Sequence, residues 1–418
     1  EIGSGLVGSE MCIRDRIIAM KLFKYFCLLS FMASCSSEQT PQELLSVDLR
    51  SGMDHPSMLA LQDEIESVEY IPLETTADPA SLLDGVSEYA VTSNYIYVSP
   101  VKEQRIVQFD RKGQFVKTLI PFGQGPGEFS DFLMGMQADE KNNRLYLFCS
   151  NKIMVYTLDG EFIQSLNHDY TIVYQRMVGK DRFASVAFPY VPFESGSYGL
   201  GVFSDKADTI AMKNDFSSPL VSHEKAGFTI ALATAYSDME ESVLFKTGSN
   251  DTVFRVTADD ILPACVLRTG NSDKEVIRSL DATDFSSLKR KFGEDYDIFV
   301  SDMFETPSNY YFRCRYNAGH YVASVHKKTG QVLAEKCAQP GDIRALGDAN
   351  LLYGMLGTKS YQDFPVWGRM QGDCLVQLLT AYELHLYKEK CNITVPPELK
   401  EVNDDSNPVF IVYKLRRV

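Results

Sequence analysis

The segment with the clearest chemical potential is a glycine-rich stretch at residues 123–129, GQGPGEF. Its glycines would let backbone amides approach an anion or a sugar, and the Glu128 carboxylate would accept hydrogen bonds from a ligand. The same residue types suit a tight connection between two structural units, and we favour that structural interpretation. No Lys-Ser or Lys-Thr pair comes after it, so the stretch is not a phosphate-binding P-loop. The candidate ligand-binding residues here are Gly123, Gln124, Gly125, Gly127 and Glu128.

A second candidate for ligand binding is a cluster of aromatic residues in the segment 188–193, FPYVPF. Its prolines interrupt any strand, so the segment is predicted to be a loop. Aromatic rings on such a loop would stack on a sugar or a peptide. The favoured alternative is that these rings pack beneath the loop. The candidate residues are Phe188, Tyr190 and Phe193.

The sequence lacks the local motifs of the common catalytic sites. Its six histidines form no HxH, HExxH or HxxxH pattern, and it contains no GxSxG nucleophile motif. The run EDYD at residues 294–297 lacks the glycine and the distal glutamate of an EF-hand loop. Adjacent acids such as Asp259 and Asp260 are typical of solvated turns, and a glycosidase pair needs a separation that sequence does not show. We therefore expect no metal and no cofactor, and we favour a non-enzymatic function.

The N-terminal segment has the pattern of an exported protein. Residues 1–19 bear no relation to the rest of the chain and are predicted to be a non-native leader. Residues 20–34 place two lysines before a short apolar core, which is typical of a signal peptide and too short to span a membrane. The sequence MASC at residues 32–35 resembles the bacterial lipobox, so Cys35 is the predicted site of lipidation; an ordinary signal peptide with a chance cysteine is the alternative. Residues 35–50 are predicted to be a polar tether, with membrane contact through the lipid alone.

Composition narrows the class of partner. The chain has 41 Lys and Arg residues against 56 Asp and Glu residues, a formal net charge of −15. Binding to a phosphate backbone needs clustered cations, so we expect no nucleic-acid partner. None of the nine cysteines has CxxC spacing, which excludes the usual zinc and redox motifs. Several lie in apolar runs and are expected to be small buried hydrophobes, with one disulfide as the alternative.

Two segments align without a gap and indicate a structural repeat. Residues 105–120, RIVQFDRKGQFVKTLI, and residues 152–167, KIMVYTLDGEFIQSLN, share Ile, Gly, Phe and Leu at positions 47 residues apart. Each is predicted to be a β-hairpin with glycine in its turn, and two further strands precede each hairpin. Four strands per unit, at a period of about 40 to 50 residues, are typical of a β-propeller blade. One blade cannot bury both of its faces, so blades stack around an axis.

Looser copies of this unit predict an all-β, six-bladed propeller of four-stranded antiparallel blades over residues 51–418, with five or seven blades as the alternatives. The copies lie at residues 199–214, 241–270, 310–336 and 351–387. Short helical insertions are predicted at residues 272–293, which begin with a capping box, and at residues 396–402.

Several motifs together resemble a known family. They are SVEYIPLETT (67–76), the hairpin pattern FD..G.F, GQGPGEF (123–129) and DDSNPVFIVYKL (404–415). They resemble six-bladed β-propeller lipoproteins of bacteroidete-type bacteria, a family similar to the NHL and TolB-like propellers. The resemblance implies six blades, a cell-envelope location and no established reaction. In such rings strands from both termini commonly close the last blade, and the strands near Val68 and at residues 409–415 suit that closure.

Three functions remain open from the sequence. The favoured one is a cell-envelope lipoprotein whose propeller binds a glycan, a peptide or a protein partner without catalysis. The alternative is an envelope hydrolase or lyase with a site assembled on the propeller axis from separate blades. A third is a structural partner in an outer-membrane complex, which a large exposed apolar patch would indicate.

Overall fold

The computed structural model divides the chain into a short unit, Glu1–Leu44, and a larger unit, Leu45–Val418. All strands and helices of the described residues lie in the larger unit. The described residues are 44–57, 59, 61–103, 105–125, 127–149, 151–168, 172–187, 200–213, 234–238, 241–247, 251–269, 298–317, 319–337, 369–390 and 395–416. Among them, no helix is long and apolar enough to cross a membrane.

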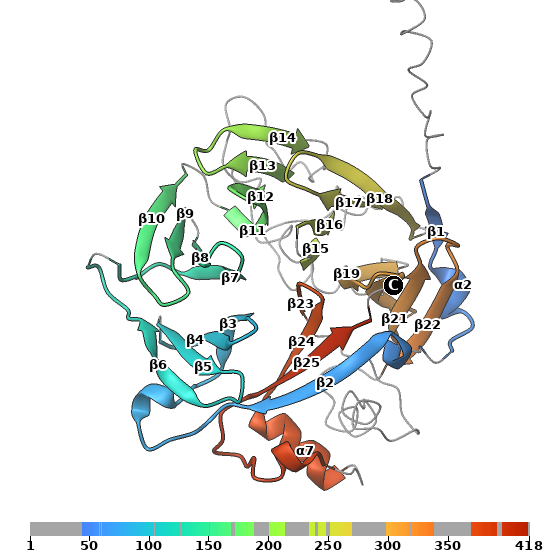
Figure 1. Ribbon diagram of the computed structural model, residues 1–418. Helices are drawn as coiled ribbons and strands as arrows, with labels where there is room; N and C mark the ends of the chain where they lie inside the picture. Colours follow the sequence, from blue (N-terminus) through green and yellow to red (C-terminus); the bar gives the residue numbers. More distant parts are fainter. Residues whose placement is uncertain are drawn as a thin grey trace, which may run out of the picture. The chain divides into compact units, whose positions relative to one another are not determined.

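The larger unit is a six-bladed β-propeller, which confirms the predicted fold class (Figure 1). In five blades the first strand along the chain lies nearest the axis and the later strands lie progressively further out, whereas the sixth blade has its N-terminal strand on the outside. Blade 1 contains β3 (Val86–Val91), β4 (Tyr95–Pro100), β5 (Ile106–Asp110) and β6 (Phe115–Ile120); blade 2 contains β7 (Leu133–Asp139), β8 (Arg144–Cys149), β9 (Lys152–Tyr156) and β10 (Phe162–Asn167); blade 3 contains β11 (Ile172–Gly179), β12 (Arg182–Ala187), β13 (Leu200–Ser204) and β14 (Thr209–Lys213).

The remaining three blades have the same antiparallel order. Blade 4 contains β15 (Thr234–Asp238), β16 (Val243–Thr247), β17 (Thr252–Val256) and β18 (Ile261–Arg268); blade 5 contains β19 (Ile298–Glu305), β20 (Asn309–Tyr316), β21 (Gly319–His326) and β22 (Val332–Cys337); blade 6 contains β23 (Arg369–Gln371), β24 (Cys374–Leu379), β25 (Val409–Leu415) and β2 (Ile65–Pro72). Buried aliphatic and aromatic side chains of neighbouring blades form shared clusters, so the core lies mainly between blades. Stacking in this way buries both faces of each sheet.

The aligned 47-residue repeat corresponds to the outer hairpins β5–β6 and β9–β10. Its glycines, Gly113 and Gly160, have φ of +81° and +93° in the hairpin turns. A Cβ on Gly113 would lie 2.0 Å from the carbonyl oxygen of Pro72, and one on Gly160 would lie 2.9 Å from that of Leu119. Pro72 and Leu119 belong to the outer strands of the preceding blades, so both glycines permit the same close inter-blade contact.

Strands from both ends of the chain close the ring, as the resemblance implied. Strand β2 pairs antiparallel with β25 over residues 65–72 and 409–415. Strand β25 in turn pairs with β24. Blade 6 therefore combines the N-terminal and C-terminal segments in one sheet (Figure 1).

The described residues between 45 and 64 form a strap along the outer strands of blades 4 and 5. Strand β1 (Ser46–Asp48) adds to β18 as a parallel fifth strand, an addition that the repeat did not predict. Helix α2 (Arg50–Met53) contacts β22, and the amide of Ser57 donates to the carbonyl oxygen of Ala334 at 2.7 Å. A 3-10 turn, η1 (Leu61–Glu64), then leads into β2. Strand β1 falls within residues 35–50, for which the sequence predicted a tether.

The helices differ in part from the sequence prediction. Helix α7 (Ala381–Lys390) comes after β24, where the sequence suggested that blade strands continue to residue 387. The helix predicted at residues 396–402 is a single 3-10 turn, η4 (Pro397–Leu399), and a similar turn, η2 (Pro79–Ser81), precedes β3. The insertion predicted at residues 272–293 lies outside the described residues.

Candidate functional site

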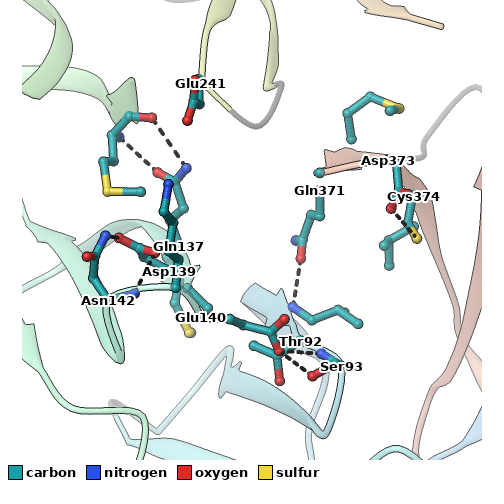
Figure 2. Close-up of a pocket in the computed structure, with 18 of the residues that line it drawn as sticks. Thr92, Ser93, Gln137, Asp139, Glu140, Asn142, Glu241, Gln371, Asp373 and Cys374 are labelled. Carbon is teal, nitrogen blue, oxygen red and sulfur yellow. Dashed lines mark hydrogen bonds between the residues drawn. The ribbon is translucent and has the colours of Figure 1, made fainter. Parts of the chain in front are cut away.

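A pocket of about 590 Å³ lies at the propeller axis (Figure 2). The carboxyl-terminal ends of the innermost strands form it, together with the turns that lead from them to the second strands. Blades 1, 2, 3, 4 and 6 all contribute described residues. We call it the axial pocket; its volume falls in the range of small-ligand sites, roughly 300 to 1,000 Å³.

Two glutamines fix the wall of the axial pocket by bonding to the backbone of the next blade. The Gln137 amide accepts from the Met177 amide at 2.8 Å and donates to the Met177 carbonyl oxygen at 3.4 Å. The Gln371 oxygen accepts from the Val91 amide at 2.7 Å, and its nitrogen donates to the carbonyl oxygen of Tyr89 at 3.3 Å. Each side chain thus bridges two innermost strands, β7 to β11 and β23 to β3.

The turns of blades 1 and 2 are joined in a similar way. The Glu140 carboxylate accepts from the hydroxyl of Ser93 at 2.9 Å and also from its amide (Figure 2). Within the blade 2 turn, Asp139 accepts from the side-chain amide of Asn142 at 2.7 Å. Hydrogen bonds therefore connect blades 6, 1, 2 and 3 into one preorganised arc around the pocket. Because the side chains of this wall are already ordered, less conformational entropy is lost when a ligand binds.

The rim of the axial pocket carries charges of both signs. Lys141, Lys180 and Glu241 are exposed and form no ion pair among the described residues. Asp373 and Cys374 line the blade 6 side, and burial, together with Asp373, raises the pKa of the Cys374 thiol to about 11. A thiol with so high a pKa is a poor nucleophile at neutral pH, because the thiolate is the reactive form. The rim suits a polar ligand rather than a purely apolar one.

Charged side chains from four innermost strands lie deeper along the axis than the pocket. Arg369 of β23 donates to the Glu88 carboxylate of β3 at 2.6 Å. Arg176 of β11 is buried and crosses the innermost strand of blade 2 at Gly135, where a Cβ would lie 2.1 Å from its Nη1. Gly135, which Arg176 crosses, and Arg369 each lie two residues before a bridging glutamine. The guanidinium groups of Arg176 and Arg369 therefore lie at a similar depth along the axis.

Asp302 of β19 completes this set, which we call the axial charge cluster: Glu88, Arg176, Asp302 and Arg369. Burial raises the pKa of Asp302 to about 6, although the Met303 amide, Arg313 and Arg369 act to lower it. Its side chain is still 43% exposed, so water at the axis screens part of the desolvation. Carboxyl groups with shifted pKa values in a concave site are candidates for function.

The structure does not bring the glycine-rich stretch to the axial pocket. The Glu128 carboxylate accepts from the Gly125 amide within its own loop at 2.9 Å. A Cβ on Gly123 would lie 1.9 Å from that carboxylate, and one on Gly127 would lie 3.1 Å from Phe162 of the outer strand β10. The loop therefore lies at the outer rim between blades 1 and 2, and its carboxylate closes the loop itself. Gln124 belongs to the same loop, and none of the five candidates lines the axial pocket.

The other predicted site residues fall outside the described residues: Cys35, Phe188, Tyr190 and Phe193. Among the residues that the structure describes, no group of three His, Cys, Asp or Glu side chains could hold a metal ion. Cys149, Cys265 and Cys314 are buried, as expected for small core residues.

The axial residues that the structure brings together were not among the predicted site residues. Gln137, Asp302, Arg369 and Gln371 lie in short strands among apolar residues. A polar residue inside an innermost strand is the one signal that could have marked them, because apolar side chains normally fill both faces of a blade.

The family comparison covers almost the whole propeller. Residues 44–414 match the family described as Domain of unknown function (DUF4934). No curated protein matches the chain. A protein of Bacteroides fragilis described as exported has a similar structure, with a TM-score of 0.63 and 15% identity over 89% of this chain and 99% of that one. A member of the DUF4221 family from Bacteroides vulgatus has a TM-score of 0.45 and 11% identity over 85% and 98%. The chain belongs to the DUF4934 family, and the B. fragilis structure shares its fold.

Proposed function

We propose that this protein is a cell-envelope binding module whose ligand enters the axial pocket, without catalysis. One observation carries this proposal: a pocket of about 590 Å³ whose walls are fixed by hydrogen bonds across four neighbouring blades. A rigid concave site that combines an apolar lining with a few polar groups is typical of small-ligand binding. Met136, Met177 and Met370 supply part of that apolar lining and belong to the buried cores between blades.

Reversing the unpaired rim charges tests this proposal. The larger unit, residues 45–418, is screened against glycan and peptide arrays, and binding of each hit is then measured by calorimetry. The double variant Lys141→Glu/Lys180→Glu is expected to change the affinity for a true pocket ligand at least tenfold. The control is Lys112→Glu, which changes an exposed lysine on the turn between β5 and β6 outside the pocket lining. Hits whose affinity is equal in all three proteins would contradict binding in the axial pocket.

The envelope location rests on the lipobox-like sequence ending at Cys35 and on the export described for the B. fragilis protein of similar fold. Two acyl chains hold a protein firmly at a membrane, whereas one holds it weakly. In a bacteroidete host, the wild-type chain is expected in the membrane fraction and Cys35→Ala in the soluble periplasmic fraction. Retention of Cys35→Ala in the membrane would refute the lipid anchor.

A hydrolase or lyase is the second candidate, favoured by Asp302. An accessible carboxyl group with a pKa of about 6 has the protonation behaviour of a general acid or base. Turnover of oligosaccharide or ester libraries by the wild type, lost in Asp302→Asn while thermal unfolding shows that the variant is folded, would establish catalysis. No turnover in the wild type would leave binding as the function.

A further inference from the structure

We infer that Arg369 binds the carboxylate of a peptide ligand at the base of the axial pocket. The inference rests on the proposed function, because it names the ligand group that the same pocket would take.

Arg369 is placed to meet a ligand that fills the pocket. It lies two residues before Gln371, a pocket-lining residue, and the side chains of residues two apart in a strand share one face. Its guanidinium is therefore about 7 Å deeper than the Gln371 amide. The side chain is 36% exposed even though it belongs to an innermost strand. A ligand group that passes Gln371 would reach it.

The Arg369 guanidinium is fixed in position, yet some of its N–H donors bond to no described residue. One Nη donates to Glu88, and the group lies over the Tyr89 ring with 5.4 Å to the centroid. Its Nε and second Nη form no hydrogen bond to a described residue. Arginine presents its N–H groups in a planar fork that matches a carboxylate. The unused edge of Arg369 is thus a fixed binding site for a planar anion.

A second cation lies near Arg369 in the axial charge cluster. Arg176 is close enough to Arg369 to act on it electrostatically, and Arg313 lies 4.0 Å from Asp302. Arg176 would therefore attract an incoming carboxylate together with Arg369. Because the Arg369 side chain is 36% exposed, water weakens this attraction relative to a dry site.

The lining of the axial pocket favours a peptide over a sugar as the source of this carboxylate. No aromatic ring belongs to the described lining, so the stacking surface that sugars commonly use is missing there. The lining instead offers the Ser93 hydroxyl, which donates to Glu140 and can still accept, and the exposed ammonium groups of Lys141 and Lys180. These groups match the backbone N–H donors and carbonyl acceptors of a peptide. We therefore assign the carboxylate to the C-terminus of a peptide.

The test uses the larger unit, residues 45–418, and three probes. A tetrapeptide library with free C-termini is compared with the same library amidated, and an oligogalacturonate provides the carboxylate of a sugar. We expect free-acid peptides to bind roughly 10-fold to 100-fold more tightly than their amides, the range for a hydrogen bond to a charged group. Equal affinity of acids and amides would overturn the inference, and so would binding of oligogalacturonate without any peptide.

Two variants with opposite expected effects guard against misfolding. Removing Arg369 alone would leave the largely buried Glu88 carboxylate without its partner, so Arg369→Gln is combined with Glu88→Gln. The double variant is expected to lose the preference for free acids, whereas Glu88→Gln alone keeps Arg369 and is expected to bind free acids more tightly. Thermal unfolding confirms that both are folded. If Lys141→Glu/Lys180→Glu weakens binding but Arg369→Gln/Glu88→Gln keeps the acid preference, the carboxylate inference fails and the proposed function stands. If neither of these two double variants changes binding, the axial pocket is not the binding site.

Discussion

The side-chain amide of Asn407 donates a hydrogen bond to the carbonyl oxygen of Glu74 at 2.7 Å. The same nitrogen donates to the Ser81 carbonyl oxygen at 2.8 Å, and the Asn407 oxygen accepts from the Leu83 amide at 2.9 Å. Asn407 is 3% exposed and immediately precedes the segment that enters β25, whereas Glu74 lies just after β2. One side chain therefore ties together the two chain segments that close the ring.

We predict that Asn407→Leu lowers the free energy of unfolding by about 3 kcal/mol. The change removes three hydrogen bonds and leaves one buried and two partly buried backbone groups without these partners; a buried group left unpaired costs roughly 1 to 3 kcal/mol. Urea unfolding followed by circular dichroism measures the effect. Asn94→Ala is the control, since Asn94 is exposed on a turn and is expected to change stability by less than about 0.5 kcal/mol. Equal stability of both variants would show that the closure does not depend on Asn407.

Alanine substitutions at Gly113 and Gly372 would separate the stability cost of close packing from that of backbone conformation. Both have positive φ, +81° and +62°. A Cβ on Gly113 would lie 2.0 Å from the Pro72 oxygen, whereas one on Gly372 would meet nothing within 4 Å. Gly372→Ala is expected to cost about 1 kcal/mol, the penalty of the left-handed conformation. Gly113→Ala is expected to cost clearly more, and thermal unfolding of the two variants gives the difference. A smaller loss for Gly113→Ala would mean that blades 6 and 1 separate there without penalty.

The repeat made most of the fold predictable, because the same contact recurs. Gly113 and Gly160 stand at the same turn and meet the preceding blade in the same way. Helix α7 was not predicted, although Thr380 and Glu383 form a capping box in which the Glu383 amide donates to the Thr380 hydroxyl and Glu383 accepts in return. The adjacent apolar residues fitted a strand as well as a helix, so the local signal did not decide between them.

The candidate site could not be predicted in the same way. Strand alternation shows that Arg369 and Gln371 share a face, but not which residues of other blades lie opposite them. Glu88 and Arg369 are 281 positions apart in the sequence, and only ring closure brings them together. The glycine-rich stretch was conspicuous because of its composition, and its Glu128 proved to bond within the loop.

Glu305 provides a prediction about the contact between blades 4 and 5. Its carboxylate is 1% exposed and accepts two hydrogen bonds from Arg255, both at 2.7 Å, and one from Lys327. We expect Glu305→Gln to lower the free energy of unfolding by about 3 to 5 kcal/mol, because two cations lose their buried counter-charge. Denaturant unfolding at pH 7 measures this. Glu66→Gln removes an exposed partner of Lys414 and is expected to cost less than about 1 kcal/mol.

The same ion pairs predict a dependence on acid. Burial alone would raise the pKa of Glu305, but Arg255 and Lys327 hold it below the ordinary value of 4.5. A carboxyl group with a lowered pKa stabilises the fold above its unfolded pKa, and this contribution is lost as the pH falls through the folded value. The wild type is therefore expected to lose stability below pH 4.5 more steeply than Glu305→Gln. Parallel acid-unfolding curves would contradict this role.

Asp302 is expected to behave in the opposite way. Burial raises its pKa from 3.8 to about 6, so the folded state favours the protonated form. The stabilisation from protonation is complete below pH 3.8 and is lost as the pH rises through 6. A shift of this size corresponds to about 3 kcal/mol for a fully buried group, and since the side chain is 43% exposed we expect about 1 kcal/mol.

Asp302→Asn is therefore predicted to be more stable than the wild type at pH 8 by about 1 kcal/mol, and nearly equal to it at pH 4.5. Urea unfolding at the two pH values measures both differences, and Asp48→Asn, an exposed change outside the axis, is the control. A variant less stable than the wild type at pH 8 would mean that attraction to Arg313 and Arg369 outweighs the desolvation of Asp302. A carboxylate that weakens the fold at neutral pH is more readily explained by ligand binding at the axis than by stability, because an asparagine would serve the structure better.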